Sequence, residues 1–329
     1  MDITKETSNV AKFVCAVIVM LQHIFLALNR GTVYGHNITH IAMFTFLFLS
    51  GYGLVQSYYF NKMDRYWEKK FIKIYIPAVC VNLFAAIELL ILGVIPFDRG
   101  FLFKDIFMLN DTIIVGKYLW YLKLLLVWYI LFYGVYNFIS NRNVRLIIWL
   151  LVTIVMWCIV PETYGLANTY SLSFSVGVFY SEVLKEKRYR IKQTSKLFLL
   201  TIISILIVGL WIVFFHSDEQ LTILFEHRIN YYVYTLFTNV VFGCGTLLLC
   251  YICTNICKIN AMISHKATLL GAMSLMIYYL HTPVVVYLIE YVENVRSKYL
   301  VAVVGGMICI LISYIYGKIT ITKYTRQCH

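Results

Sequence analysis

The stretch VIVMLQHIFLAL, Val17 to Leu28, lies in the first long apolar run of the chain. Its one ionisable residue is His23, a side chain that titrates near neutral pH and is costly to place in hydrocarbon. Runs of similar character recur along the whole sequence. The stretch therefore raises two questions, namely which solvent surrounds these runs and why a histidine lies in the first of them.

Composition answers the first question. The chain of 329 residues is 61% hydrophobic and 13% charged, and its mean hydropathy of +0.76 exceeds that of soluble domains. A helix that crosses a bilayer needs about 20 apolar residues, whereas barrel strands are shorter and alternate. Ten runs of the helical kind lie approximately at 10–28, 41–60, 72–95, 119–138, 144–160, 166–184, 197–216, 231–256, 269–290 and 299–321. The sequence predicts an all-α, polytopic membrane protein with about ten transmembrane helices.

The distribution of basic residues predicts the orientation. With the N-terminus inside, 20 of the 28 Lys and Arg residues fall in cytoplasmic segments and seven in outward loops. Because cytoplasmic loops of membrane proteins are enriched in these residues, we expect both termini in the cytoplasm. The first run lacks a small-residue cleavage site and is interpreted as a retained helix. No repeat or appended soluble segment is apparent, so residues 1–329 are expected to form a single membrane domain.

Two classes of partner are not expected. The net charge of +12 lies mostly in loops that would flank anionic lipid, and the aromatic residues gather in the spans and at their ends. Nucleic acid is therefore not an expected partner. Cys250, Cys253 and Cys257 share a helix face, but no second cysteine or histidine cluster lies nearby in sequence. They are interpreted as small residues at a helix contact, and no metal site is expected.

The second run contains FTFLFLSGYGLVQSYYF, Phe44 to Phe60. Ser50, Gly51 and Gly53 in its middle would allow either the close approach of two helix backbones or the passage of a ligand chain. The following segment, RYWEKKFIKIYIP, places Lys70 and Lys73 one turn apart at the membrane boundary. These lysines fit either a phosphate-binding pair or residues that snorkel and set the topology.

Two later runs carry further polar residues. LWYLKLLLVWYILF, Leu119 to Phe132, begins with Trp120, Tyr121 and Lys123, which could contact a substrate or anchor the helix at the interface. SLMIYYLHTPVVVYL, Ser274 to Leu288, contains His281, which could orient a site, contact a substrate or pack beside a proline. Glu88 is interpreted as the only clear carboxylate deep in a span, and no role is assigned to it.

Taken in order, these segments resemble the acyltransferase-three family of integral-membrane O-acyltransferases. The matching pieces, which extend over nearly the whole chain, are VIVMLQH, FTFLFLSGY, KKFIKIYIP, LWYL, FSVGVFY and SLMIYYLH. In that family the inner motif usually reads Arg-x-x-Arg, whereas this chain has Lys70 and Lys73 there. Lysine binds phosphate as a point charge but lacks the bidentate fork of arginine.

The resemblance implies an activity. The family passes an acyl group, here expected to be acetyl, from cytoplasmic acyl-CoA to a hydroxyl group of a cell-surface glycan or its lipid-linked precursor. It implies a multi-pass protein of a bacterial plasma membrane, with acyl-CoA as donor substrate and no bound cofactor. Alone, His23 could be a satisfied packing residue, but within this order of motifs a general base is the better interpretation. It lies about 13 residues along its run, or roughly 20 Å deep at 1.5 Å per residue, which an extended pantetheine arm could reach.

The remaining roles are also implied by the resemblance. Donor contacts are expected at Lys70, Lys73, Ser50 and Gly51, and contacts that bind the acceptor or shape the site at Trp120, Tyr121, Lys123 and His281. Two rivals belong to other classes: a transporter or flippase for a glycan or lipid precursor, and a non-catalytic membrane sensor on the same fold. The first would be expected to show repeats and midplane carboxylates, and the lysines at the usual arginine positions keep the second open. The acceptor, the choice of acetyl over succinyl and the oligomeric state do not follow from the sequence.

Overall fold

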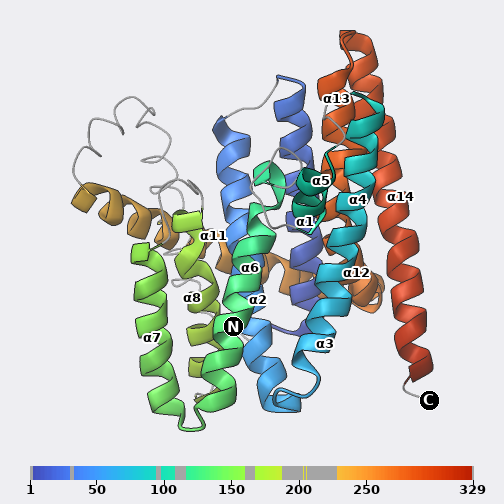
Figure 1. Ribbon diagram of the computed structural model, residues 1–329. Coiled ribbons are helices and arrows are strands. Elements are labelled where there is room, and N and C mark those ends of the chain that lie inside the picture. Colours follow the sequence, from blue (N-terminus) through green and yellow to red (C-terminus); the bar gives the residue numbers. More distant parts are fainter. Residues whose placement is uncertain are drawn as a thin grey trace. The chain divides into compact units, whose positions relative to one another are not determined.

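A computed structural model describes residues 3–29, 33–93, 98–107, 116–159, 167–186, 203, 205 and 228–327. The regular elements within these ranges are all helical (Figure 1), which confirms the all-α class. In chain order they are α1 (Lys5–Ala27), α2 (Val33–Asn61), α3 (Tyr66–Lys70), η1 (Phe71–Tyr75), α4 (Ile76–Ile91), α5 (Arg99–Ile106), α6 (Gly116–Phe138), α7 (Arg142–Ile159), α8 (Ala167–Glu186), α11 (Arg228–Ile259), α12 (Ala261–His281), η3 (Thr282–Val286), α13 (Tyr287–Tyr291) and α14 (Val295–Gln327).

Seven helical segments of the described residues are long and apolar enough to cross a membrane, which confirms the polytopic prediction. They are Lys5–Ala27, Ile38–Asn61, Tyr66–Ile91, Trp120–Phe138, Leu236–Ile259, Ala261–Tyr291 and Val295–Thr322. The predicted runs 144–160 and 166–184 fall on α7 and α8, and α8 carries a shorter apolar stretch, Leu172–Val183. Apart from residues 203 and 205, the run 197–216 lies outside the described residues. The total of ten spans and the orientation stay predictions.

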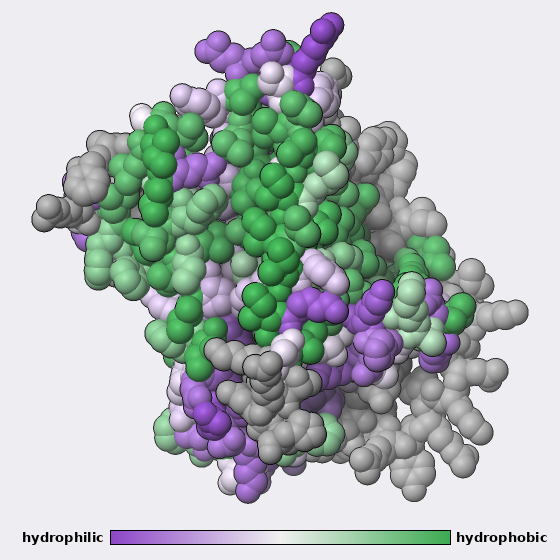
Figure 2. Space-filling model, turned by 90° about the vertical axis from the view of Figure 1, so that its right-hand side faces the viewer, coloured by the Kyte–Doolittle hydropathy of each residue, from purple (hydrophilic) through white to green (hydrophobic). Residues whose placement is uncertain are grey.

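The outer surface of α14 is suited to lipid. Val303, Met307 and Leu311, spaced four residues apart, form a stripe in which each residue is more than half exposed. The face of the molecule drawn in Figure 2 is likewise largely apolar. An exposed apolar surface of this kind is unfavourable in water but matches the acyl chains of a bilayer.

The described chain divides into two compact units. Unit 1 comprises Met1–Cys15, Thr32–Lys62 and Leu131–Ala267, and unit 2 comprises Ala16–Gly31, Met63–Ile130 and Thr268–His329. The division falls within α1, α6 and α12, so each of these helices contributes residues to both units. The expectation of a single membrane domain over residues 1–329 stays a prediction.

Unit 1 is organised around the packing of α2 against α8. A Cβ atom on Gly51 would lie 2.2 Å from the carbonyl oxygen of Phe174, and one on Gly177 would lie 2.1 Å from the carbonyl oxygen of Phe48. No real Cβ atom could be accommodated at such distances. Glycine at these two positions therefore allows the two backbones to touch.

Hydroxyl pairs attach two further helices to this core. The hydroxyl oxygens of Thr45 on α2 and Thr246 on α11 lie 2.8 Å apart, and both side chains are buried. Thr153 on α7 donates to Ser175 on α8 over 2.7 Å. These short polar side chains satisfy one another in an interior that offers little water.

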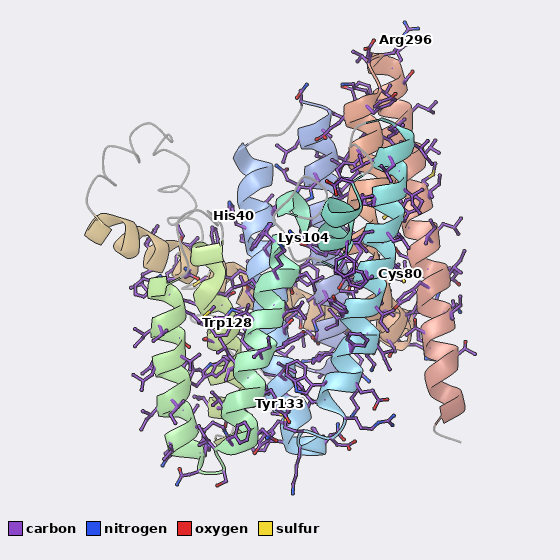
Figure 3. All side chains as sticks on the ribbon, in the orientation of Figure 1. His40, Cys80, Lys104, Trp128, Tyr133 and Arg296 are labelled. Carbon is purple, nitrogen blue, oxygen red and sulfur yellow. The ribbon has the colours of Figure 1, made fainter. Side chains whose placement is uncertain are left out.

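The described residues of unit 2 include the π-helical turns η1 and η3. Pro77 is the second residue of α4, which follows η1, and Pro283 lies in η3. Proline removes a backbone donor from a helix, which favours such local changes of winding. The hydroxyl group of Tyr279 donates to the carbonyl oxygen of Ile74 in η1 over 3.2 Å. In the same unit, Trp128 on α6 is fully buried, whereas Cys80 on α4 is exposed (Figure 3).

Candidate functional site

His23 on α1 and His281 at the end of α12 both belong to unit 2, and their imidazole rings are in contact. Nδ1 of His23 lies 2.6 Å from Nε2 of His281, the ring centroids are 4.9 Å apart and the ring planes differ by 18°. His281 is fully buried, while His23 is half-buried. The fold thus brings together two residues that are 258 positions apart in the sequence.

His281 is fixed by its own surroundings. Its Nδ1 lies 3.2 Å from the carbonyl oxygen of Ile277, one turn earlier on α12. The hydroxyl oxygen of Thr282 lies 3.3 Å from its Nε2. Both ring nitrogens of His281 therefore have polar partners, and the ring is held in one orientation relative to His23.

A row of aromatic rings leads away from the histidine pair. The ring centroid of Tyr278 lies 5.8 Å from that of His281 and 5.4 Å from that of Tyr121, and both tyrosines are buried. Trp120 and Lys123, on the same helix as Tyr121, are half-buried. Among the residues predicted on this helix, Tyr121 is connected to the histidines through the ring of Tyr278.

The two predicted donor lysines have different surroundings. Nζ of Lys70 lies 4.2 Å from the ring centroid of Tyr129 and 5.5 Å from that of Tyr66. Lys70 ends α3, whereas Lys73 is exposed within η1, so the two lysines do not lie on one regular α-helical turn as expected from the sequence. Lys70, but not Lys73, lines an open groove of about 410 Å³, whose lining is Trp67, Glu68, Lys70, Phe71, Tyr75 and Leu126.

Ser50 and Gly51 lie on α2 in unit 1. The hydroxyl group of Ser50 donates to the carbonyl oxygen of Phe46 over 2.7 Å, and Gly51 meets the backbone of Phe174. These contacts favour the close approach of two helices, which is the first of the two roles considered for this motif. A role of Ser50 and Gly51 in donor binding stays a prediction.

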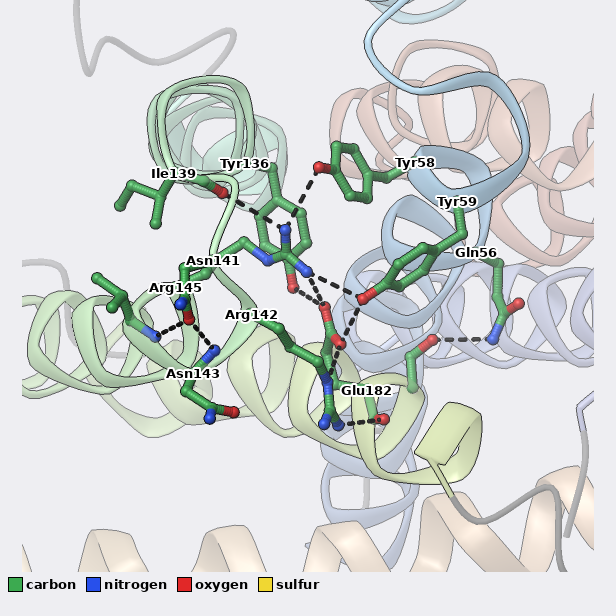
Figure 4. Close-up of polar contacts among 12 residues, drawn as sticks. Gln56, Tyr58, Tyr59, Tyr136, Ile139, Asn141, Arg142, Asn143, Arg145 and Glu182 are labelled. Carbon is green, nitrogen blue, oxygen red and sulfur yellow. Dashed lines mark hydrogen bonds and ion pairs between the residues drawn. The ribbon is translucent and has the colours of Figure 1, made fainter.

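A buried ionic cluster in unit 1 was missed by the sequence reasoning (Figure 4). The carboxylate of Glu182 on α8 is fully buried and accepts from Nη2 of Arg145 at 3.2 Å and from Nε of Arg142 at 3.1 Å. It also accepts from the hydroxyl groups of Tyr59 at 2.8 Å and Tyr136 at 3.0 Å. No role was assigned to Glu182 from the sequence, and the interpretation of Glu88 as the only clear carboxylate deep in a span stays a prediction.

Two features of the sequence could have indicated this cluster. Arg142 and Arg145, two of the 20 basic residues in the predicted cytoplasmic segments, are three residues apart and so share a helix face. Glu182 lies within the run 166–184, close to its end. By contrast, Glu88 on α4 has one buried carboxylate oxygen, Oε2, without a hydrogen-bond partner among the described residues.

The burial of Cys250, Cys253 and Cys257 on α11 agrees with small residues at a contact between helices. Cys250 and Cys253 are buried and Cys257 is half-buried. In the part of the chain that the structure describes, no group of three or more His, Cys, Asp or Glu side chains is arranged to hold a metal ion.

The fold and this site define a multi-pass helical membrane protein with two contacting histidines in its membrane-spanning helices. The sequence model of the acyltransferase 3 family, described as an acyltransferase domain, matches residues 6–317. The chain therefore belongs to the acyltransferase 3 family, a family of membrane acyltransferases, as the order of motifs predicted. No curated protein and no solved structure matches it. The matched region includes His23, Lys70 and His281.

Proposed function

We propose that this protein transfers an acyl group, acetyl in the first place, from cytoplasmic acyl-CoA to a hydroxyl group of a cell-surface glycan or of its lipid-linked precursor. His23 is the general base in this proposal. The observation that carries it is the 2.6 Å contact between His23, which is half-buried, and His281, which is fully buried. An imidazole held in this way within an apolar helix fits proton transfer better than packing alone.

The chemistry follows from the functional groups. The acceptor hydroxyl oxygen attacks the carbonyl carbon of the thioester while His23 takes the hydroxyl proton. The new carbon–oxygen bond is kept, the carbon–sulfur bond breaks, and the CoA thiolate leaves. The thiolate then receives the proton from His23, so the products are the acylated acceptor and CoA thiol, and the base returns to its initial state.

The donor is proposed to bind beside Lys70. The groove there combines a cation with a lining that is apolar apart from Glu68 and Lys70. An ammonium group suits a CoA phosphate, and the apolar lining suits the less polar pantetheine arm. Lys73, exposed on η1, would meet a second phosphate from the side of bulk water. On the predicted topology both lysines face the cytoplasm, where acyl-CoA is found.

The acceptor is proposed to approach from the opposite side of the membrane. Trp120 and Lys123 are half-buried, and the rings of Tyr121 and Tyr278 continue from them to His281. Aromatic faces and a lysine suit the stacking and hydrogen-bonding surfaces of a sugar. The proposal places the protein in a bacterial plasma membrane, with the bilayer and the glycan as its partners.

Transfer of labelled acetyl groups tests the proposal. Purified protein in lipid nanodiscs is given radiolabelled acetyl-CoA and an envelope glycan fraction, and both label in glycan and free CoA thiol are measured. We expect label transfer by the wild-type protein and its loss in His23→Gln, whereas His265→Gln, which changes an exposed histidine, should retain activity. Full activity of His23→Gln would contradict the assignment of the base.

The same experiment distinguishes the enzyme from both rivals, because neither rival releases CoA thiol. A sensor would bind acetyl-CoA without releasing CoA thiol, and a transporter or flippase would move a glycan precursor without consuming the donor. The buried Glu182 carboxylate gives the transporter little support, because two arginines and two tyrosines already satisfy it. A carboxylate that couples transport to an ion must be free to exchange its partners.

A further inference from the structure

We infer that His281 is a positioning residue that fixes the tautomer of His23, so that Nε2 of His23 is the atom that accepts the proton. The catalytic consequence rests on the proposed function. The tautomer itself is a property of the resting protein and can be measured without donor or acceptor.

The neutral ring of His281 carries its proton on Nδ1. A backbone carbonyl oxygen can only accept a hydrogen bond, so the contact of 3.2 Å between Nδ1 and Ile277 requires a proton on Nδ1 of His281. The ring is fully buried, and no carboxylate contacts it among the described residues, so the neutral form is the favoured one. A neutral imidazole has one N–H group. Nε2 of His281 is therefore an acceptor.

The neutral ring of His23 carries its proton on Nδ1 as well. Its Nδ1 faces the Nε2 lone pair of His281 at 2.6 Å, a distance at which one of the two nitrogens must carry a proton. Because Nε2 of His281 has none, Nδ1 of His23 is the donor. The ring centroids are 4.9 Å apart and the two nitrogens 2.6 Å apart. The difference is about two ring radii, as expected when the nitrogens point directly at each other. His23 in its neutral form then carries no proton on Nε2.

The two histidines differ in burial, in agreement with the roles proposed for them. The half-buried ring of His23 can meet a hydroxyl group, whereas the fully buried ring of His281 cannot. When Nε2 of His23 takes a proton, Nδ1–H remains bonded to His281, and that hydrogen bond becomes charge-assisted and stronger. His281 keeps its own proton on Nδ1 throughout. It acts on the reaction only by orienting His23 and stabilising the imidazolium.

Thr282 and Tyr278 complete the support. The hydroxyl group of Thr282, 3.3 Å from Nε2 of His281, is a second possible donor to the same lone pair. The ring of Tyr278 packs against His281 with a centroid distance of 5.8 Å. The Thr282 contact is compatible with an acceptor at Nε2, and neither residue offers a negative charge that would favour a charged His281.

Nitrogen NMR of the intact protein in nanodiscs tests the tautomer. Histidines are labelled with 15N, and the signals of His23 are identified as those that disappear in His23→Gln. Protonated and unprotonated ring nitrogens have well-separated chemical shifts. We expect a protonated Nδ1 and an unprotonated Nε2 in the resting wild-type protein. A proton on Nε2 of His23 in the resting wild-type protein would overturn the inference, regardless of the tautomers measured in the His281 variants.

Two variants of His281 test the cause. Gln can place a carbonyl oxygen near the position of Nε2 and should keep the His23 tautomer, whereas Leu removes the acceptor and should release it to the Nε2–H form or a mixture. An unchanged tautomer in a folded His281→Leu protein would overturn the positioning role. The wild-type measurement still decides the tautomer if the Leu variant does not fold.

Steady-state kinetics of the same His281 variants test the catalytic consequence. If the proposed function holds, His281→Leu should lower kcat by about 10²-fold or more with little change in the KM for acetyl-CoA. His281→Gln should stay within about tenfold of wild type, because it restores the acceptor. Equal losses in both variants would contradict positioning through the hydrogen bond. A wild-type protein that shows the expected tautomer but transfers no acyl group would refute the proposed function and leave the tautomer assignment standing.

Discussion

Arg145 on α7 and Glu182 on α8 form an ion pair of 3.2 Å in which the two side chains are 3% and 0% exposed (Figure 4). Arg142 pairs with the second carboxylate oxygen of Glu182 and donates to its backbone carbonyl oxygen at 2.9 Å. Tyr59 on α2 and Tyr136 at the end of α6 donate to the same carboxylate. One carboxylate therefore joins segments of four helices in unit 1.

Removal of this carboxylate should destabilise the protein strongly. In Glu182→Gln the side chain keeps its shape, but Arg145 remains buried without a counter-charge. Loss of one partner from a buried ion pair typically costs about 3–5 kcal/mol of the free energy of unfolding. We expect a large decrease in the thermal unfolding temperature of the detergent-solubilised protein, while the double variant Arg145→Met with Glu182→Met should recover part of the loss.

An exposed pair provides the control. The guanidinium group of Arg65 donates hydrogen bonds to the carboxylate of Glu68, which raises the pKa of Arg65. Both side chains are exposed. Exposed ion pairs contribute little to stability, so Glu68→Gln should leave the unfolding temperature nearly unchanged. Equal effects of Glu68→Gln and Glu182→Gln would show that the buried cluster has no special role.

The glycine contacts between α2 and α8 make a second prediction. Gly51→Ala and Gly177→Ala each place a methyl group against backbone carbonyl oxygens that cannot move without separating the helices. Overpacking of this kind costs about 1–3 kcal/mol. Gly53→Ala is the matched control, because a Cβ atom there has no neighbour within 4 Å.

The measurement is thermal unfolding together with donor KM. A role of Gly51 in packing predicts that Gly51→Ala lowers the unfolding temperature about as much as Gly177→Ala does. A role in passing the donor chain predicts instead an unchanged unfolding temperature and a raised KM for acyl-CoA. The two roles considered from the sequence are thereby distinguished.

The sequence predicted the helices better than the contacts between them. Apolar runs near 20 residues determine helices by solvent and length alone, which is why the all-α polytopic class could be predicted. His23 and His281 were each recognised as unusual in apolar surroundings, but their contact spans 258 residues and depends on how α1 and α12 rotate about their axes. No local pattern encodes that rotation.

The buried ionic cluster shows a different difficulty. Arginine near the start of a membrane helix is usually a marker of topology, and Arg142 and Arg145 were interpreted in that way. Whether such a guanidinium snorkels to water or turns inward depends on a carboxylate from another helix, here Glu182. The tertiary partner therefore decides the role, and the spacing of the arginines alone does not.

The predicted orientation can be tested by cysteine accessibility. Single cysteines are introduced near Met1 and near His329 on a background without the native cysteines, of which Cys80 is exposed on α4. Because basic residues are enriched 20 to 7 in the predicted inner segments, both probes should react only after the membrane is permeabilised. Labelling of either terminus in sealed cells by an impermeant reagent would refute the orientation.

The last prediction concerns Lys70 and Lys73 as contacts to donor phosphates. Lys70→Ala and Lys73→Ala should each raise the KM for acyl-CoA by roughly tenfold, since a charge-assisted hydrogen bond is worth about 1.5–3 kcal/mol. Lys70 should have the larger effect, because it lines the groove and its ammonium group is held over Tyr129. The effect should weaken at high salt, which screens exposed phosphate contacts. Arginine at both positions should restore or strengthen binding, because it supplies the bidentate fork.

Lys69→Ala is the matched control for these variants. Lys69 lies in the same segment and has the same charge, but its ammonium group bonds the backbone carbonyl oxygen of Asp64 at 2.9 Å and lies 3.7 Å from the Asp64 carboxylate. If basic residues here serve only to keep the segment in the cytoplasm, the three alanine variants should behave alike, with no change in donor KM while the other basic residues remain. A raised KM in Lys70→Ala and Lys73→Ala but not in Lys69→Ala would instead assign the effect to contact with the donor. An unchanged KM for acyl-CoA in Lys70→Ala, in Lys73→Ala and in the double arginine variant would show that these two lysines serve only to set the topology.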